Sequence, residues 1–543
     1  MFIAGIFINL NMPVKKEGII MYGISALLTR AARFFPDKIA IADIRGGIKY
    51  SQLEEKVNVL CNSLLKLGLR KGDRIGFVSH NCNEFIILWL AAQRIGCVTV
   101  LYNYRATREE RIRDINRAKC KAVFFGIGDV LDEPLGNNTP EVKIFFTYKT
   151  AVEGAHLIEE LIADENSSNP PKISILPDEV STILFTSGST GISKGVVRTH
   201  RIMLEYTMQL AAEHEFYKTE DFIVLSHSPL FHTVGLSMLM KSLALMGTYI
   251  GVNGVHPDEY KKLIDEYSVN HLFFVPPVNV MRLRQTDDFS QNVYPTIKHI
   301  WGTGGQLSAQ HIRALADLFP EAYLKTSYGG TELCCACSIC FDEKLKNLKL
   351  DRKNLKSVGY VTMFSDVKLV DDEGNEVETD EAGELIISSP LLMREYLDMP
   401  EQTQSVLRDG WYYTGDIFTK DRDGLFYLVG RKSSMIKTGG ENVFPAEVES
   451  VLRECPGLKD CCVIGLQDEK WGEAIAAAIV PENKDLRIED VIEFTNKMIA
   501  GFRKPRYYAI IDALPLTGSG KTDRNALRDT SEYQFIGIDR LMQ

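Results

Sequence analysis

A segment rich in glycine and hydroxyl side chains carries the clearest chemical signal in this sequence. Residues 186–195 read Thr-Ser-Gly-Ser-Thr-Gly-Ile-Ser-Lys-Gly and directly follow the apolar run at 183–185. Glycine lets a backbone approach a ligand closely, and hydroxyls beside one lysine supply hydrogen-bond donors and positive charge. These features predict a polyphosphate-binding loop at the end of a strand, and they disfavour a polar hairpin without a ligand.

Two common nucleotide-binding patterns do not fit the sequence. In a P-loop, the places of the second glycine and of the metal-binding hydroxyl would fall on Ser193 and Gly195. A later glycine-lysine segment has Pro515 where a P-loop begins with glycine. A dinucleotide-binding fingerprint at 302–307 fails because Leu307 stands at its last glycine. P-loop kinases and dinucleotide-binding enzymes are therefore disfavoured.

The chain as a whole is acidic, although the loop suits an anionic ligand. It has 543 residues, and its 62 Lys and Arg against 72 Asp and Glu give a formal net charge of −10. This charge disfavours broad nucleic-acid binding, but a few local cations and backbone N–H groups can still hold one phosphate group. Hydrophobic residues make up 45% and charged residues 25%, which is typical of soluble globular proteins, and the length indicates more than one domain.

Alternating strands and helices are expected to position the loop. From residue 24 to about 370, segments of helical period alternate with short β-rich runs, among them 74–78, 122–125 and 271–275. This alternation predicts α/β layers with largely parallel sheets. From about residue 366, short strands separated by turn pairs predict a β-rich subdomain. Beyond Gly430 a compact α+β pattern begins.

The predicted fold class is therefore α/β. A large N-terminal domain of parallel-rich α/β sheets with a β-rich subdomain is followed by a small α+β C-terminal domain. We expect an N-terminal extension at 1–22, the large domain at 23–430 and the small domain at 431–543. The boundary falls where the composition changes after Gly430.

The cysteines indicate a reducing compartment. Eleven cysteines show no spacing typical of a disulfide framework, so we expect free thiols and a cytoplasmic protein. Four of them fall at 334–340, where buried cysteines on a strand explain the run better than zinc does, because no second ligand pair follows. The apolar N-terminus is too short to span a bilayer, and 85–100 reads as a buried helix followed by a strand, so no integral membrane protein is expected.

Further motifs follow the loop in order along the chain. They are Pro-Leu-Phe-His at 229–232, Gly-Thr-Gly-Gly at 302–305, Ser-Tyr-Gly-Gly-Thr-Glu at 327–332, Trp-Tyr-Tyr-Thr-Gly-Asp at 411–416, Gly-Arg at 430–431, Ile-Lys-Thr-Gly-Gly-Glu-Asn-Val-Phe-Pro-Ala-Glu-Val-Glu at 436–449 and Pro-Leu-Thr-Gly-Ser-Gly-Lys at 515–521. This ordered set resembles the AMP-forming adenylating superfamily of acyl-CoA synthetases, peptide-synthetase adenylation domains and luciferases. The resemblance extends from about residue 24 to residue 528. Ser193 departs from it, because the family usually has proline there.

The resemblance implies a reaction in two halves. A carboxylate attacks the α-phosphate of ATP to give an acyl-adenylate and pyrophosphate, and a thiol, usually that of coenzyme A, then displaces AMP. ATP, Mg²⁺ and coenzyme A are thus the implied cofactor and co-substrates of an AMP-forming acyl-CoA ligase. Two alternatives stay open: a ligase that loads the phosphopantetheine thiol of an acyl carrier protein, and a non-catalytic or luciferase-like binding protein. We expect a monomer or homodimer that acts on small molecules and not on nucleic acid.

The same resemblance implies which residues bind ATP and AMP. They are Thr186, Ser187, Gly188, Ser189, Thr190, Gly191, Lys194, Gly304, Gly305, Tyr328, Gly329, Thr331, Asp416 and Arg431. Among them, Tyr328 would face the adenine ring and Thr331 would donate to the α-phosphate. Asp416 would accept hydrogen bonds from the ribose hydroxyls, and Arg431 would reach the ribose or a phosphate.

Four residues are implied to be catalytic. They are Lys521, Glu332, Thr186 and His232. Glu332 and Thr186 would hold Mg²⁺ against the phosphates, because carboxylate and hydroxyl oxygens suit this ion. Lys521 would bridge the attacking carboxylate and the α-phosphate with a compact positive charge.

The second half-reaction is implied to need a rotation of the small, mobile C-terminal domain. Ser433 occupies the hinge position, where the family more often has Asp or Lys. Lys437, Gly439 and Gly440 resemble the segment that lines the pantetheine tunnel and would bind coenzyme A. Small residues there leave room for a thin thiol arm.

The substrate pocket is implied to lie around His232. Peptide-synthetase domains that take α-amino acids carry Asp at this position, so an α-amino acid is disfavoured. The predicted pocket residues are His232, Val234, Gly235 and Val275, with Leu236, Met238, Met240 and Val278 as apolar neighbours. Such a pocket suits an aliphatic or aryl carboxylic acid, and we expect an aliphatic fatty acid.

Overall fold

The computed structural model of the chain describes most of the sequence from Tyr22 to Ile538. The described residues are 22–126, 138–163, 168–186, 193–213, 221–274, 279–284, 286–305, 307, 309–350, 352–482, 486–499, 501–516, 522–529 and 532–538. Several predicted site residues lie outside them, namely Ser187, Gly188, Ser189, Thr190, Gly191, Val275 and Lys521. The same holds for Val278 and for residues 1–21 of the predicted extension.

An eight-stranded sheet carries the predicted phosphate loop at the end of one strand. Its order is β19-β9-β8-β4-β3-β5-β6-β7. The strands are β3 (Arg74–Ser79), β4 (Val98–Leu101), β5 (Ala122–Gly126), β6 (Ile144–Thr147), β7 (His156–Leu157), β8 (Val180–Thr186), β9 (Lys194–Thr199) and β19 (Glu395–Tyr396). The strands from β8 to β7 pair in parallel, and β9 folds back antiparallel on β8. The predicted strands at 74–78, 122–125 and 183–185 are confirmed.

A nine-stranded sheet carries most of the other motifs. Its order is β16-β15-β14-β13-β12-β10-β11-β1-β2. The strands are β1 (Ile39–Asp43), β2 (Gly46–Lys49), β10 (Ile223–Ser226), β11 (Thr248–Gly251), β12 (His271–Phe274), β13 (His299–Thr303), β14 (Tyr323–Gly330), β15 (Cys334–Lys344) and β16 (Tyr360–Val361). The central pairs from β1 to β14 are parallel. The 302–305 and 327–332 motifs therefore follow neighbouring parallel strands at the same edge of the sheet.

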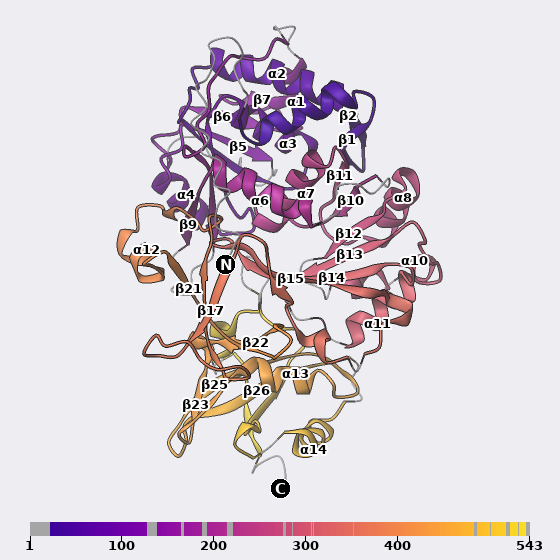
Figure 1. Cartoon of the computed structure of the whole chain (residues 1–543), viewed down its shortest axis with the longest axis vertical. Helices are drawn as coiled ribbons and strands as arrows, with labels where there is room; N and C mark the ends of the chain where they lie inside the picture. The colour runs from indigo at the N-terminus through magenta and orange to yellow at the C-terminus, as the bar shows by residue number, and fades with distance from the viewer. Residues whose placement is uncertain are drawn as a thin grey trace, which may run out of the picture.

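Helices fill the space between these two sheets, as Figure 1 shows. They are α1 (Ile24–Phe34), α2 (Tyr50–Lys66), α3 (Asn83–Arg94), α6 (His200–Ala212) and α7 (Thr233–Ala244). Their buried side chains form one core with strand residues of both sheets. Every residue of α3 except Glu84 is buried, because sheets or helices surround it, and this confirms the predicted buried helix followed by a strand.

The outer faces of both sheets carry five further helices among the described residues. They are α4 (Arg108–Arg117), α8 (Pro257–Tyr267), α9 (Val280–Leu283), α10 (Asp287–Ser290) and α11 (Ala309–Leu318). The short helix α5 (Ile158–Ala163) packs instead beside α2, and its Ile158 belongs to the core between the sheets. Buried residues of α8 and α11 pack on the nine-stranded sheet, and Ile115 of α4 packs on the eight-stranded sheet. The molecule therefore has the alternating α/β layers that the sequence predicts.

Two further sheets follow along the chain. The predicted β-rich subdomain contains β17 (Asp366–Val370), β18 (Gly383–Ser388), β20 (Leu407–Arg408), β21 (Trp411–Lys420), β22 (Phe426–Arg431) and the helix α12 (Pro400–Val406). A six-stranded sheet then contains β23 (Ile436–Thr438), β24 (Glu441–Val443), β25 (Leu458–Asp468), β26 (Gly472–Pro481), β27 (Tyr507–Ile510) and β28 (Ile536–Gly537). Its helices are α13 (Pro445–Leu452), α14 (Ile488–Met498) and α15 (Arg524–Leu527). This last unit, at the bottom of Figure 1, has a core of its own.

The cysteine run at 334–340 lies on a strand, as predicted. Cys334, Cys335 and Cys337 of β15 are buried and Cys340 is exposed. At the start of this strand the backbone of Gly329 lies so close to Cys334 that a Cβ atom would be 2.0 Å from the Cys334 carbonyl oxygen. Position 329 of the 327–332 motif therefore requires glycine for packing, whether or not a ligand also requires it.

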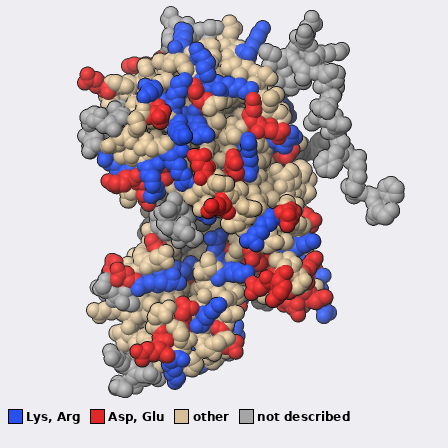
Figure 2. Space-filling model, turned by 90° about the vertical axis from the view of Figure 1, so that its left-hand side faces the viewer, with Lys and Arg blue, Asp and Glu red and all other residues tan. Residues whose placement is uncertain are grey.

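Charged side chains are spread unevenly over the surface. Figure 2 shows Lys and Arg gathered over the upper part of one face and Asp and Glu more frequent over its lower part. An acidic chain can in this way present a locally cationic surface. Among the helices of the described ranges, we find none with the length and apolarity needed to cross a membrane.

Candidate active site

A cavity of about 530 Å³ brings several of the predicted nucleotide-binding residues together. Its walls come from the eight-stranded sheet, from the turn after β14 and from the β-rich subdomain. The lining residues are Thr186, Lys194, Glu332, Asp371, Asp372, Glu373, Gly374, Glu384, Tyr396, Ser405, Val406, Arg408, Tyr412, Tyr413, Thr414, Gly415, Arg431 and Lys432. Thr186, Lys194, Glu332 and Arg431, which lie far apart in the sequence, thus face one space.

The two ends of the predicted phosphate loop are fixed by the sheet. Thr186 ends β8, Lys194 begins β9, and the two residues are paired across the antiparallel ladder. The Lys194 Nζ atom lies 4.8 Å from the centre of the Tyr396 ring, a cation–π distance. The two described ends of the predicted loop, Thr186 and Lys194, therefore both lie at the wall of the cavity.

Ser193, which stands where the family usually has proline, is anchored by α4. Its Oγ donates to Asp114 Oδ2 at 2.6 Å, and its carbonyl oxygen accepts from Arg117 at 2.7 Å. Arg113 also donates to the Ser193 Oγ at 3.3 Å. These contacts restrict the loop's C-terminal end, which a proline would restrict through its ring.

A buried arginine holds the turn that carries Glu332. Arg198 of β9 is 1% exposed, and its Nε and Nη2 donate to the Thr331 carbonyl oxygen at 3.2 and 2.5 Å. Glu332 Oε1 accepts a hydrogen bond of 2.9 Å from the Tyr396 hydroxyl. Burial, with the charge of Glu332, raises the pKa of Tyr396, so the phenol stays protonated and keeps donating. The Glu332 side chain is thereby held in place on the cavity wall.

A second cluster forms around Asp416. The Tyr328 hydroxyl donates to Asp416 Oδ2 at 2.7 Å, and Arg431 Nε donates to Oδ1 at 2.7 Å. Asp416 is 6% exposed, whereas the Arg431 side chain is largely exposed. Gly415 adopts a φ of 69°, which a residue with a Cβ rarely adopts, and thereby turns the chain before Asp416. The predicted adenine and ribose residues are therefore in direct contact with one another.

Gly304 and Gly305 follow β13 and are exposed. Gly304 has a φ of 77°, so its position favours glycine. The strand before it ends on Thr303, whose Oγ1 donates to the Ser327 carbonyl oxygen at 2.9 Å. The two glycines consequently lie next to the Tyr328 segment of the neighbouring strand.

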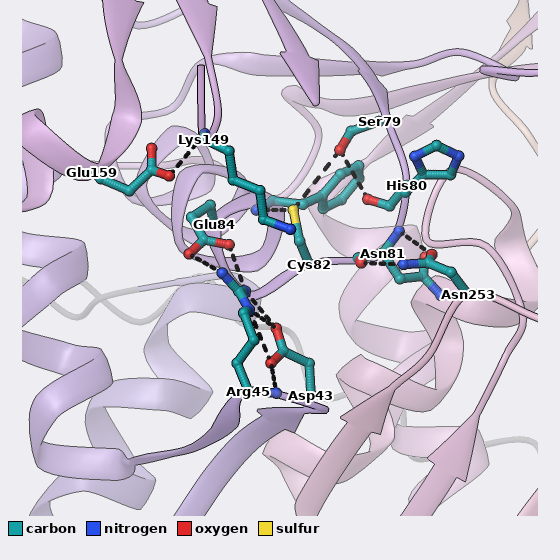
Figure 3. Close-up of polar contacts among 11 residues, drawn as sticks. Asp43, Arg45, Ser79, His80, Asn81, Cys82, Glu84, Lys149, Glu159 and Asn253 are labelled. Atoms are coloured by element: carbon teal, nitrogen blue, oxygen red, sulfur yellow. Dashed lines mark hydrogen bonds and ion pairs between the residues drawn. The ribbon is translucent and has the colours of Figure 1, made fainter. Parts of the chain in front are cut away.

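His232 stands directly before the first residue of α7, at the end of the Pro-Leu-Phe-His segment. The buried Asn81 fixes this segment: its Nδ2 donates to the Ser228 carbonyl oxygen at 3.0 Å, and its Oδ1 accepts from the Leu230 N–H at 2.8 Å. The Asn253 side chain pairs with the backbone of Asn81: its Oδ1 accepts from the Asn81 N–H at 2.8 Å and its Nδ2 donates to the Asn81 carbonyl oxygen at 3.0 Å, as Figure 3 shows. Arg45 in the same figure links Asp43 of β1 to Glu84 of α3. The Asn81 contacts tie the ends of the two large sheets together at the segment that ends at His232.

The predicted acid-pocket residues divide into two groups. Val234 is half-buried, whereas Leu236, Met238 and Met240 are almost fully buried in the helix-lined core. Packing explains why position 235 is glycine, because a Cβ there would lie 2.2 Å from the Pro229 carbonyl oxygen. The role of these residues toward an acid stays a prediction.

The predicted hinge and coenzyme A residues follow β22 along the chain. Ser433 is in a short 3-10 helix (Lys432–Ser434), and Lys432 donates to Asp372 at 2.7 Å and to Glu384 at 3.2 Å. Lys437, Gly439 and Gly440 lie on the β23–β24 hairpin, and both glycines have positive φ angles. They do not line the cavity around Glu332.

The oxygen atoms at the cavity wall suit a Mg²⁺ ion that is also bound by phosphate oxygens of a nucleotide. Glu332 offers a carboxylate and Thr186 a hydroxyl, which are hard oxygen ligands. Within the described ranges, no group of three His, Cys, Asp or Glu side chains could hold a metal alone. Mg²⁺ commonly binds through one or two carboxylates together with substrate phosphates and water, which is the set that this wall can complete.

Comparison with known proteins identifies the family. The profile described as AMP-binding enzyme matches residues 28–397, and that of the AMP-binding enzyme C-terminal domain matches residues 447–521. The chain belongs to the AMP-binding enzyme family. This AMP-binding enzyme is 29% identical to a feruloyl-CoA synthase of Amycolatopsis sp over 525 residues, covering 93% of its own chain and 98% of that protein. It is 30% identical over 491 residues to the long-chain-fatty-acid–CoA ligase FadD13 of Mycobacterium tuberculosis, with 90% and 93% of the two chains covered.

The solved structures show the same fold. The o-succinylbenzoate coenzyme A synthetase of Bacillus subtilis, in complex with ATP and magnesium, matches with a TM-score of 0.79 at 24% identity, covering 93% of this chain and 99% of that chain. The predicted α/β fold with a β-rich subdomain and a C-terminal unit is thereby confirmed.

Sequence reasoning missed two residues that the structure places at the site. Arg198 and Asn81 act on backbone atoms of the Thr331 and Pro229 turns, far from them along the chain. Arg198 lies four residues after Lys194, and Asn81 lies at the carboxyl end of β3. A polar residue at the carboxyl end of a parallel strand is the signal that could have pointed to Asn81.

Proposed function

We propose that this AMP-binding enzyme is an AMP-forming acid–thiol ligase that activates an aliphatic carboxylic acid and transfers it to coenzyme A. ATP-dependent acyl-CoA formation is supported by relatives that are named CoA ligases over nearly their whole length, and ATP and coenzyme A are accordingly the co-substrates. One observation carries the assignment to this chain: Thr186, Lys194, Glu332 and Arg431 line a single cavity. A small enclosed set of cations and oxygens suits one nucleotide and not a polymer.

In this proposal the nucleotide lies across the cavity. Asp416 accepts from the ribose hydroxyls while Tyr328 and Arg431 hold its carboxylate in place, since each carboxylate oxygen can accept more than one hydrogen bond. Lys194 and the loop at 187–192 bind the β- and γ-phosphates, and Thr331 binds the α-phosphate. Gly304, Gly305 and Gly329 give the adenine close access to the backbone.

Mg²⁺ would be held by Glu332 and Thr186. When bound, it neutralises charge on the phosphates as pyrophosphate leaves. Lys521 is proposed to bring the attacking carboxylate to the α-phosphate. His232, at the start of α7, orients that carboxylate. A metal and cations are needed because both reactants are anions, which repel one another.

The second half-reaction is assigned to the C-terminal unit. We place the boundary of the large and small domains at 430/431, just before the chain passes from the sheet of β22 to the sheet of β23. Rotation about Ser433 would bring the hairpin of Lys437, Gly439 and Gly440 to the site. The contacts of Lys432 with Asp372 and Glu384 hold the chain just before this hinge. All eleven cysteines are free, which supports a cytoplasmic location.

A panel of acids tests the proposed activity. With ATP, Mg²⁺ and coenzyme A, we expect AMP, pyrophosphate and an acyl-CoA in equal amounts for at least one aliphatic acid, and no turnover of α-amino acids. Mass spectrometry of the thioester and chromatography of the nucleotides give the readout. ADP in place of AMP would contradict the reaction type, whereas AMP formation that coenzyme A does not stimulate would instead support a carrier-protein acceptor.

A further inference from the structure

A lysine is buried inside the helix that follows His232. Lys241 of α7 is 5% exposed, and its Nζ lies 5.2 Å from the centre of the Phe222 ring and 5.5 Å from that of Trp301. The ammonium itself makes no hydrogen bond or ion pair with any described residue. A buried ammonium is costly unless it is paired, and two aromatic rings stabilise it only in part.

When Lys241 is protonated, the charged side chains near it among the described residues leave one positive charge in excess. Lys325 forms an ion pair with Glu213 and lies 4.3 Å from the centre of the Trp301 ring, on the same ring system that Lys241 approaches. Burial, followed by the charge of Lys325, lowers the pKa of Lys241 to about 7. Glu213 is the one carboxylate near both lysines among the groups that influence Lys241, and the thiols of Cys335 and Cys340 are the other titratable neighbours.

The helix places this lysine on the acid side of the proposed site. Lys241 follows Val234 by seven residues, so both project from the same face of α7, with about 10 Å between them along the axis. Val234 is the half-buried residue two positions after His232. Lysine side chains on a helix point back toward its N-terminus, which brings the ammonium closer to the His232 end.

Trp301 connects the lysine to the nucleotide motifs. It lies on β13 two residues before Thr303, and its Nε1 donates to the Ser327 Oγ at 2.8 Å, one residue before Tyr328. Trp301 thus links Lys241 of α7 to the segment of β14 that carries Tyr328.

We infer that Lys241 binds a second negatively charged group at the far end of the acid, so that the preferred substrates are aliphatic dicarboxylic acids. The inference rests on the proposed ligase function and narrows its substrate class. One carboxylate would lie at His232 and react, and the other would pair with Lys241. An uncharged acyl tail of the same length would offer the ammonium no hydrogen-bond acceptor.

Matched acids test this specificity. Pyrophosphate release is measured with succinate, glutarate, adipate and suberate and with the monocarboxylates of equal length. We expect the best diacid to exceed its monocarboxylate at least about tenfold in kcat/KM, the effect of one charged hydrogen bond. Lys241→Met, which keeps the apolar stem and removes the charge, should abolish that ratio while the monocarboxylate rate stays within a few-fold. Lys262→Met, an exposed lysine of α8, is the control and should keep the ratio.

Several results would overturn the inference. A wild-type enzyme that prefers monocarboxylates at every length, or ω-hydroxy acids over diacids, would refute an anionic partner for Lys241, while the ligase function would still stand. An unchanged ratio in Lys241→Met would do the same. If no acid releases pyrophosphate, the proposed function fails, and thermal shifts then decide: a diacid that stabilises wild type but not Lys241→Met supports the site, and equal shifts refute it.

Discussion

Replacement of Lys521 by alanine is expected to lower acid-dependent pyrophosphate release at least about 10²-fold, the usual effect of removing a group that stabilises charge in a transition state. Thioester formation from synthetic acyl-adenylate and coenzyme A should stay within a few-fold of wild type. The reason is that Lys521 is assigned only to adenylate formation, in which the substrate carboxylate approaches the α-phosphate of ATP. Rapid-quench measurement of pyrophosphate and of acyl-CoA separates the two halves.

The matched control for this variant is Lys504→Ala. Lys504 belongs to the same C-terminal unit, and its Nζ donates to the Asn496 carbonyl oxygen and side chain at 3.2 and 3.1 Å. Both half-reactions should continue at nearly the wild-type rate in this variant. An equal loss of the two half-reactions in Lys521→Ala, with unchanged folding by circular dichroism, would defeat the assigned role.

Replacement of Glu332 by glutamine is expected to slow adenylate formation by about 10²–10³-fold and to raise the Mg²⁺ concentration needed for half-maximal activity. Glutamine keeps the size of the side chain, and its carbonyl oxygen can still accept from Tyr396, which donates to Glu332 at 2.9 Å. The change therefore removes the charge while the wall of the cavity stays packed. A magnesium titration of pyrophosphate release measures both effects.

Glu373→Gln provides the control for that experiment. Glu373 also lines the cavity but is exposed, at a turn of the β-rich subdomain. Loss of its charge should change the rate by less than a few-fold. If both variants lost activity equally, general electrostatics of the cavity would explain the effect and Glu332 would lose its specific role.

Much of the fold follows from local patterns. The runs at 74–78 and 122–125 become β3 and β5, and the described part of the run at 271–275, His271–Phe274, becomes β12, because apolar runs of this length bury well in a parallel sheet. The apolar face at 310–319 becomes α11. Helix α13 ends at Leu452, and Cys455 is buried after its end.

The parts of the site that sequence reasoning missed depend on contacts between distant residues. Arg198 meets Thr331 and Asn81 meets Ser228 only after two sheets have packed on the same helices. Ser193, a departure from the family pattern, has an anchor on α4 that no local rule predicts. Lys241 lies in an otherwise largely apolar helix. Met238 and Met240 of this helix were predicted as neighbours of the pocket, and no role was predicted for the lysine.

The central claim is that the first half-reaction forms an enzyme-bound acyl-adenylate and that the second half-reaction consumes the same intermediate. Single-turnover mixing of excess enzyme with acid, ATP and Mg²⁺, without coenzyme A, measures it most directly. We predict pyrophosphate in an amount equal to the limiting ATP and enzyme-bound acyl-adenylate, with AMP released only when coenzyme A is added. Release of AMP and pyrophosphate together before coenzyme A, with no bound adenylate, would contradict the account.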